Sequence, residues 1–183
     1  LKPKKTMENK TSGQAVKILI VEDDEDDFLI IKDLILEGLA GVHPVLDHAT
    51  THAEMVAYLD KNEYNLCLFD YRLGDVDGLQ LLREIRAKGI AVPVIFLTGQ
   101  VDQEIAVESM KAGANDNLSK SRLTAETLVH SIRYSIDLHK EACARKQAEE
   151  RAKKSHDEAS EKNAELHESL LKLQAAQNQI LRS

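Results

Sequence analysis

The chain has 183 residues, 43% of them hydrophobic, which suits one domain of about 100–150 residues with an appendage. Its 31 acidic and 24 basic residues give a formal net charge of -7, which argues against general nucleic-acid binding through phosphate neutralisation. The apolar runs have the length of strands, far below the roughly 20 residues of a membrane helix. We therefore expect a cytoplasmic protein that binds no nucleic acid and does not insert into a membrane.

The first part of the chain changes character near residue 16. Residues 1–15 are polar and lysine-rich without apolar periodicity, which predicts a disordered leader. From Val16 to about Leu138, strand-like apolar runs alternate with segments of helical periodicity, the pattern of a parallel α/β sheet. The expected strands are 17–22, 44–49, 65–70, 93–97 and 115–118, and the expected helices are 25–39, 51–61, 78–88, 101–112 and 122 onward.

Beyond Leu138 the composition shifts to Glu, Lys, Ala, Gln and Ser, without Pro or Gly, which favours continuous helix. A heptad seam recurs there with alternating spacings of four and three, at Leu166, Leu170, Leu173, Gln177 and Ile180, and all of these but Gln177 are apolar. This heptad pattern predicts a parallel dimeric coiled coil. The alternative is a helix without a partner, which would fray.

Several chemically active side chains follow the ends of the predicted strands. Glu22 and Asp23 follow the first strand, Asp70 ends the third, Thr98 ends the fourth and Lys120 follows the fifth. Because parallel strands place their carboxyl ends at one edge of the sheet, we expect these groups to converge there.

A run of acidic residues, from Asp24 to Asp27, opens the first predicted helix. Negative charge at this position complements the helix dipole, so we assign the run to capping and exclude it from the site.

The converging groups suit phosphoryl transfer. Carboxylates held close together repel one another unless a cation neutralises them, and hard oxygen ligands favour Mg²⁺. Asp70 would then be the nucleophile, while the Thr98 hydroxyl and the Lys120 ammonium would contact the transferred phosphoryl group.

Four segments together resemble the receiver domain of two-component response regulators. They are Ile18–Asp24, Phe69–Leu73 with Asp77 and Gly78, Leu97–Gly99, and Lys111–Ala114 leading to Lys120. The resemblance implies a flavodoxin-like (βα)5 doubly wound parallel sheet of order 2-1-3-4-5 at residues 16–138. The long C-terminal helix would follow, with residues 139–183 as a coiled-coil linker.

The resemblance also implies roles for individual residues. Asp70 would be the phosphoacceptor, and Glu22 and Asp23 would form the acidic pocket. Mg²⁺ would be held by this metal site of Glu22, Asp23, Asp70 and the main-chain carbonyl of Arg72. The chain departs from the family at Asn117, where receivers usually carry an aromatic switch residue, and at Ser121, where proline is common.

The implied phosphodonor is a histidine kinase or a phosphotransfer protein. The chain would catalyse its own aspartyl phosphorylation and dephosphorylation without being an independent enzyme. We favour a receiver that controls a histidine kinase output, absent from this chain, through a homodimeric C-terminal helix. The alternatives are another output, such as a diguanylate cyclase, and a dimeric scaffold that is never phosphorylated.

Overall fold

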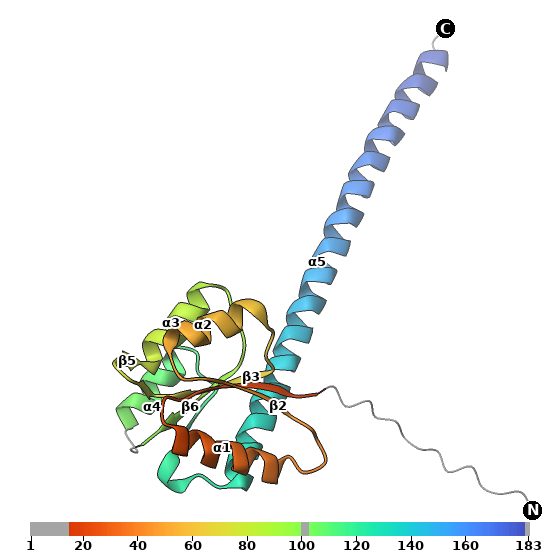
Figure 1. Cartoon of the computed structure of the whole chain (residues 1–183). Helices are drawn as coiled ribbons and strands as arrows, with labels where there is room; N and C mark the ends of the chain where they lie inside the picture. The colour runs from red at the N-terminus through yellow and green to blue at the C-terminus, as the bar shows by residue number, and fades with distance from the viewer. Residues whose placement is uncertain (1–14, 100–102, 182–183) are drawn as a thin grey trace, which may run out of the picture. The chain divides into compact units, whose positions relative to one another are not determined.

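The computed structural model describes residues 15–99 and 103–181, so 14 of the 15 residues of the predicted leader lie outside the described part. The chain separates into two compact units, of which the first extends to His139 and the second begins at Lys140. In the first unit a five-stranded parallel sheet has the order β2-β1-β3-β6-β7 (Figure 1). The strands are β1 (Lys17–Val21), β2 (Val45–Ala49), β3 (Leu66–Asp70), β6 (Val94–Thr98) and β7 (Asp116–Ser119). The strands β4 and β5 form a separate hairpin, so β6 and β7 are the fourth and fifth strands of the sheet. The predicted doubly wound sheet of order 2-1-3-4-5 is therefore confirmed.

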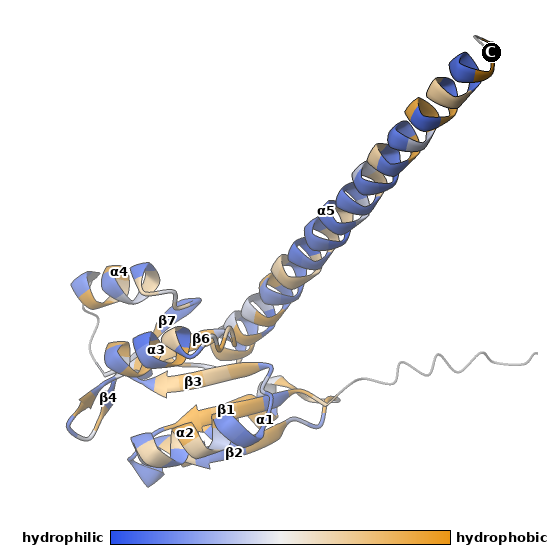
Figure 2. Cartoon of the chain, turned by 90° about the horizontal axis from the view of Figure 1, so that it is seen from above, coloured by the Kyte–Doolittle hydropathy of each residue, from blue (hydrophilic) through white to orange (hydrophobic). Residues whose placement is uncertain are grey.

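The central strands are buried on both sides. Every residue of β3 and of β6 is buried, and their sequences LCLFD and VIFLT are almost continuously apolar, as expected of inner parallel strands. The hydropathy colouring shows the same apolar character along β1 and β3 (Figure 2). Since successive side chains of a strand point to opposite faces, these runs supply two separate cores.

Helices cover both faces of the sheet. The core on one face joins alternate strand residues to α2 (His52–Lys61) and α3 (Gly78–Ala87). The core on the other face joins the remaining strand residues to α1 (Glu25–Gly38) and to the first turns of α5 (Ala125–Leu181). The helix α4 (Gln103–Lys111) contacts β7.

Side-chain caps define where the helices begin. The Asp24 carboxylate accepts hydrogen bonds from the backbone N–H groups of Asp26 and Asp27, which confirms its predicted capping role. The Thr124 hydroxyl accepts from the backbone N–H of Thr127 at 3.1 Å in the same way. A 3-10 turn over Lys120–Arg122 precedes this cap. The last helix therefore begins at Ala125, three residues later than predicted.

A short hairpin after β3 was not predicted from the sequence. It pairs β4 (Arg72–Leu73) with β5 (Val76–Asp77), and two-residue strands are too short to show a period. Gly74 lies in its turn with a φ of 57°, a conformation that favours glycine.

The second unit consists of the remainder of α5, which ends at Leu181. The predicted long C-terminal helix is confirmed, and its described residues from Lys140 onward are exposed. Over residues 15–99 and 103–181, no helix combines the length and the apolar character needed to cross a membrane.

Within the first unit, α1 and α5 approach each other closely at Gly38. A Cβ atom at this position would lie 2.5 Å from Val129 Cγ2 and 2.9 Å from the carbonyl oxygen of Ala125. The absence of a side chain at Gly38 therefore allows the two helices to pack together.

We expect Gly38→Ala to lower the free energy of unfolding by about 1–3 kcal/mol, because the added methyl group overpacks this contact. Urea unfolding measures the loss. Val129→Ala should relieve part of the clash, so the double variant should be more stable than the sum of the two single effects. A Gly38→Ala variant as stable as the wild type would contradict the tight contact.

Candidate functional site

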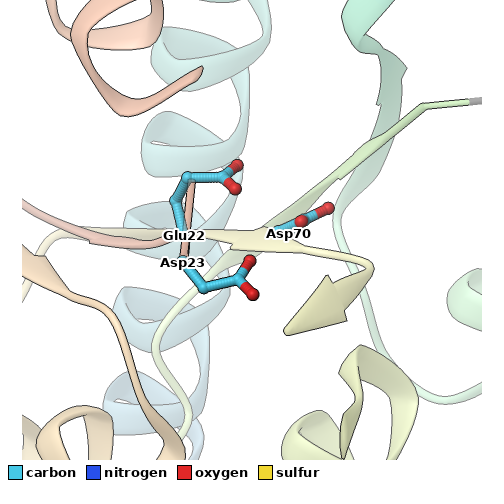
Figure 3. A group of neighbouring side chains, drawn as sticks. All are labelled: Glu22, Asp23 and Asp70. Atoms are coloured by element: carbon cyan, nitrogen blue, oxygen red, sulfur yellow. The ribbon is translucent and has the colours of Figure 1, made fainter. Parts of the chain in front are cut away.

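Three carboxylates gather at the carboxyl edge of the sheet. Glu22 and Asp23 follow β1, while Asp70 is the last residue of β3, and Figure 3 shows the three side chains. One oxygen of each lies within 4.8 Å of those of the other two. The register explains this proximity, because Val21 pairs with Phe69 and the residues that follow each of them become neighbours. Glu22 and Asp70 are buried, whereas Asp23 is exposed.

The unpredicted hairpin holds Asp23 in place. The backbone N–H of Gly74 donates a hydrogen bond of 3.0 Å to Asp23 Oδ2. A loop that follows β3 thus orients an acid that follows β1.

Lys120 is the cation of this site. Its Nζ lies 2.6 Å from Glu22 Oε2, 2.7 Å from Asp27 Oδ2 and 3.3 Å from Asp70 Oδ2. The register between β6 and β7 explains this position, because Ser119, the residue before Lys120, pairs with Thr98 on β6. The structure therefore brings Lys120 together with the predicted acids.

The exclusion of Asp27 from the site was wrong. Asp27 lies in the first turn of α1, where its sequence context indicated only helix capping, yet its side chain forms an ion pair with Lys120. The two residues are 93 positions apart, so no local pattern could have revealed the contact. Asp27 lies three residues after the N-cap Asp24, and this position alone does not show that its carboxylate points toward Lys120.

A pocket of about 350 Å³ opens beside these groups. It is lined by Asp27, Asp70, Tyr71, Arg72, Thr98, Gly99, Ile105 and Lys120. Thr98 is buried, and its hydroxyl donates a long hydrogen bond of 3.4 Å to Asn117 Oδ1. Ile105 was not singled out from the sequence, and Tyr71 was named only as part of the segment Phe69–Leu73, since an apolar or aromatic lining residue has no distinctive spacing.

Burial and charge shift two pKa values in the site. Burial raises the pKa of Glu22 to about 7, assisted by the neighbouring charge of Asp70 and opposed by the bond from Lys120. Burial disfavours the charged form of Lys120, but hydrogen bonds to Asp27 and Glu22 outweigh it and raise the pKa of the ammonium. Lys120 is therefore a permanent cation near neutral pH, while Glu22 titrates there.

The donor set suits a hard divalent cation. Carboxylate oxygens from Glu22, Asp23 and Asp70 lie close enough to share one ion, and the exposure of Asp23 leaves room for coordinated water. Mg²⁺ prefers such a site, with few carboxylates and several waters.

The fold and the site together define a doubly wound α/β domain with an acidic, lysine-containing pocket at the carboxyl end of its sheet. Residues 18–133 match the model of the response regulator receiver domain. The chain belongs to this family.

Individual relatives agree with this assignment. The chain is 35% identical over 115 residues to the response regulator RppA of Synechocystis sp., covering 62% of this chain and 47% of the relative. It is 34% identical over 109 residues to the transcriptional regulatory protein RprY of Bacteroides fragilis, covering 58% of this chain and 44% of the relative. The chain thus spans about half the length of these curated relatives.

A solved structure shows the same fold. The CheY-like receiver domain protein of Methanospirillum hungatei superposes with a TM-score of 0.61 at 26% identity, covering 70% of this chain and 99% of that one.

The raised pKa of Glu22 predicts a pH-dependent stability of the metal-free chain. Between the unfolded pKa of 4.5 and the folded value of about 7, the folded state holds a proton that the unfolded state has lost. Protonation therefore favours folding in this range, and the advantage disappears as the pH rises through 7. In EDTA, we expect the Tm of the wild type to fall by a few degrees relative to Glu22→Gln as the pH rises from about 4.5 to about 7, and to change little relative to it above pH 7. Parallel Tm curves for the two proteins would show that Glu22 ionises normally.

Proposed function

We propose that the chain accepts a phosphoryl group on Asp70 in a two-component phosphorelay, with a histidine kinase or a phosphotransfer protein as the donor. The observation that carries this proposal is the position of the Asp70 carboxylate in a pocket that also holds a cation and a hydroxyl. Asp70 Oδ2 lies 3.3 Å from Lys120 Nζ, and Thr98 lines the same pocket.

In the proposed reaction, a carboxylate oxygen of Asp70 attacks the phosphorus of a phosphohistidine. A P–O bond to Asp70 forms as the P–N bond breaks, and the bonding electron pair leaves with the imidazole nitrogen. Lys120 and Thr98 donate hydrogen bonds to the phosphoryl oxygens and offset their charge. Dephosphorylation is the attack of water on the same phosphorus, which returns the free carboxylate and inorganic phosphate.

Mg²⁺ fits the acidic group beside the nucleophile. Asp23, Asp70 and the main-chain carbonyl of Arg72 would hold the ion, and Glu22 would contribute buried negative charge. When bound, Mg²⁺ supplies positive charge to the phosphoryl oxygens. The two oxygens of Glu22 already accept hydrogen bonds from Lys120 Nζ and from the backbone N–H of Asp24, so Asp23 and Asp70 are the more available ligands.

Hydrogen bonds offer a route from the pocket to α5 within the first unit. The Thr98 hydroxyl donates a hydrogen bond to Asn117 Oδ1. The backbone N–H of Asn117 in turn donates a hydrogen bond of 2.8 Å to Asp116 Oδ1. The Ser131 hydroxyl on α5 donates to the other oxygen of Asp116. If Thr98 turns toward a phosphoryl oxygen, the half-buried Asn117 loses a donor and must rearrange. We propose that this polar connection replaces the usual aromatic switch.

The C-terminal part of α5 is proposed to form a parallel homodimeric coiled coil. Its apolar heptad positions are largely exposed in the single chain, with Leu166 at 60%, Leu173 at 68% and Ile180 at 74%. A second copy of the helix would cover them. Because α5 is one helix over Ala125–Leu181, we propose that it relays the phosphorylation signal through the coiled coil to a histidine kinase output.

We expect wild-type chain incubated with Mg²⁺ and acetyl phosphate to gain one phosphoryl group, visible by intact mass, and Asp70→Asn to gain none, because Asn lacks the nucleophilic oxygen. Asp75→Asn is a matched control, since Asp75 is an exposed residue of the hairpin turn and should leave the adduct unchanged. Wild type that stays unmodified with both acetyl phosphate and a phosphohistidine donor would favour the scaffold alternative.

Leu173→Glu should shift the chain from dimer toward monomer by light scattering, because it places a charge in the apolar seam. A drop in association of more than about tenfold is expected for the loss of one buried leucine contact. Leu171→Glu is the matched control, because Leu171 is 53% exposed and lies outside the heptad positions. Equal dissociation of both variants, or a monomeric wild type at tens of micromolar, would refute the seam.

A further inference from the structure

Asp27 contacts the site lysine without belonging to the group of three carboxylates that suits a metal ion. Its Oδ2 lies 2.7 Å from Lys120 Nζ, closer than Asp70 Oδ2 at 3.3 Å. Asp27 also lines the pocket beside Asp70 and Thr98. Its carboxylate therefore occupies the surroundings in which the phosphoryl oxygens are proposed to lie.

The ammonium of Lys120 has three anionic neighbours in this arrangement, and it donates hydrogen bonds to two of them, Glu22 and Asp27. An ammonium group has three N–H donors, and three carboxylates, those of Glu22, Asp27 and Asp70, surround Lys120 Nζ within 3.3 Å. A phosphoryl group on Asp70 can replace the Asp70 contact, and to gain a further hydrogen bond from Lys120 it must compete with Glu22 or Asp27.

Exposure decides which of the two hydrogen-bonded partners, Glu22 or Asp27, releases Lys120 more readily. The Glu22 side chain is 1% exposed, so losing Lys120 would leave a buried carboxylate without its cation, which is costly. The Asp27 side chain is 40% exposed, so water can replace the ammonium at little cost. The exchangeable partner of Lys120 is therefore Asp27.

We propose that Asp27 is a positioning residue that holds Lys120 away from the phosphoryl group and competes with that group for the ammonium. The inference rests on the proposed function of Asp70 as phosphoacceptor and adds a residue that sets how tightly the phosphorylated state is held. Phosphorylation exchanges the Asp27–Lys120 ion pair for a phosphoryl–Lys120 contact. Removing the Asp27 charge should therefore favour the phosphoryl-bound state.

The test uses beryllofluoride, a tetrahedral phosphoryl analogue that bonds to a carboxylate oxygen, with the full chain in Mg²⁺ and ¹⁹F NMR to measure the bound fraction. We expect Asp27→Asn to bind about two- to fivefold tighter than the control Asp26→Asn, the range set by the loss of one partly exposed ion pair. Asp26 is exposed and lies in the same first turn of α1, so its variant removes the same charge from the same helix end. Asp27→Glu retains a carboxylate and should keep the wild-type affinity.

Each result has a distinct meaning. If wild type and Asp26→Asn bind the analogue and Asp27→Asn binds equally or more weakly, the role of Asp27 is refuted while the phosphoacceptor stands. If no variant binds it in Mg²⁺, the phosphoacceptor function fails and this inference fails with it. Asp27→Ser is a second neutral variant should Asp27→Asn prove unstable, and a merely structural role would change Tm without changing the affinity relative to Asp26→Asn.

Discussion

The crowding of negative charge around one ammonium group is the constraint on which the site depends. Glu22, Asp27 and Asp70 all lie within 3.3 Å of Lys120 Nζ, and Asp23 lies beside them. Such a group of carboxylates is unfavourable unless cations are present, so the arrangement favours both a charged lysine and a bound divalent ion. The same crowding prepares the pocket for a reaction in which an anionic group must be received. A phosphoryl group on Asp70 would compete with Glu22 and Asp27 for the ammonium of Lys120.

The sheet makes this crowding possible. Parallel pairing brings the ends of β1, β3, β6 and β7 to one edge, and the two helical layers bury the strands so that their ends cannot separate. Burial also raises the pKa of Glu22. The apolar core is closely packed and holds the strand ends in place, so it fixes the distances between the charged groups of the site.

The last helix belongs to two physical environments. Its first turns contribute Leu128, Ile132 and other buried side chains to the core of the first unit, together with Ser131, which bonds Asp116. Its later turns carry exposed apolar residues at heptad spacing. The packing of the first turns and the association of the later turns therefore involve the same helix. This shared helix is the physical basis of the proposed relay.

The sequence by itself determined the sheet order through the resemblance to receivers. The alternation of elements followed from apolar periodicity, the long helix from a composition without Pro or Gly, and the convergence of Asp70, Thr98 and Lys120 from their positions at strand ends. These features depend on local periodicity and on the parallel arrangement, which a sequence displays directly. Only the tertiary structure decided that Asp27 contacts Lys120, that Gly74 holds Asp23, and that Gly38 lets α1 and α5 pack closely. Each of these contacts joins residues far apart in the chain through the direction of one side chain or the lack of one, and neither composition nor periodicity records that direction.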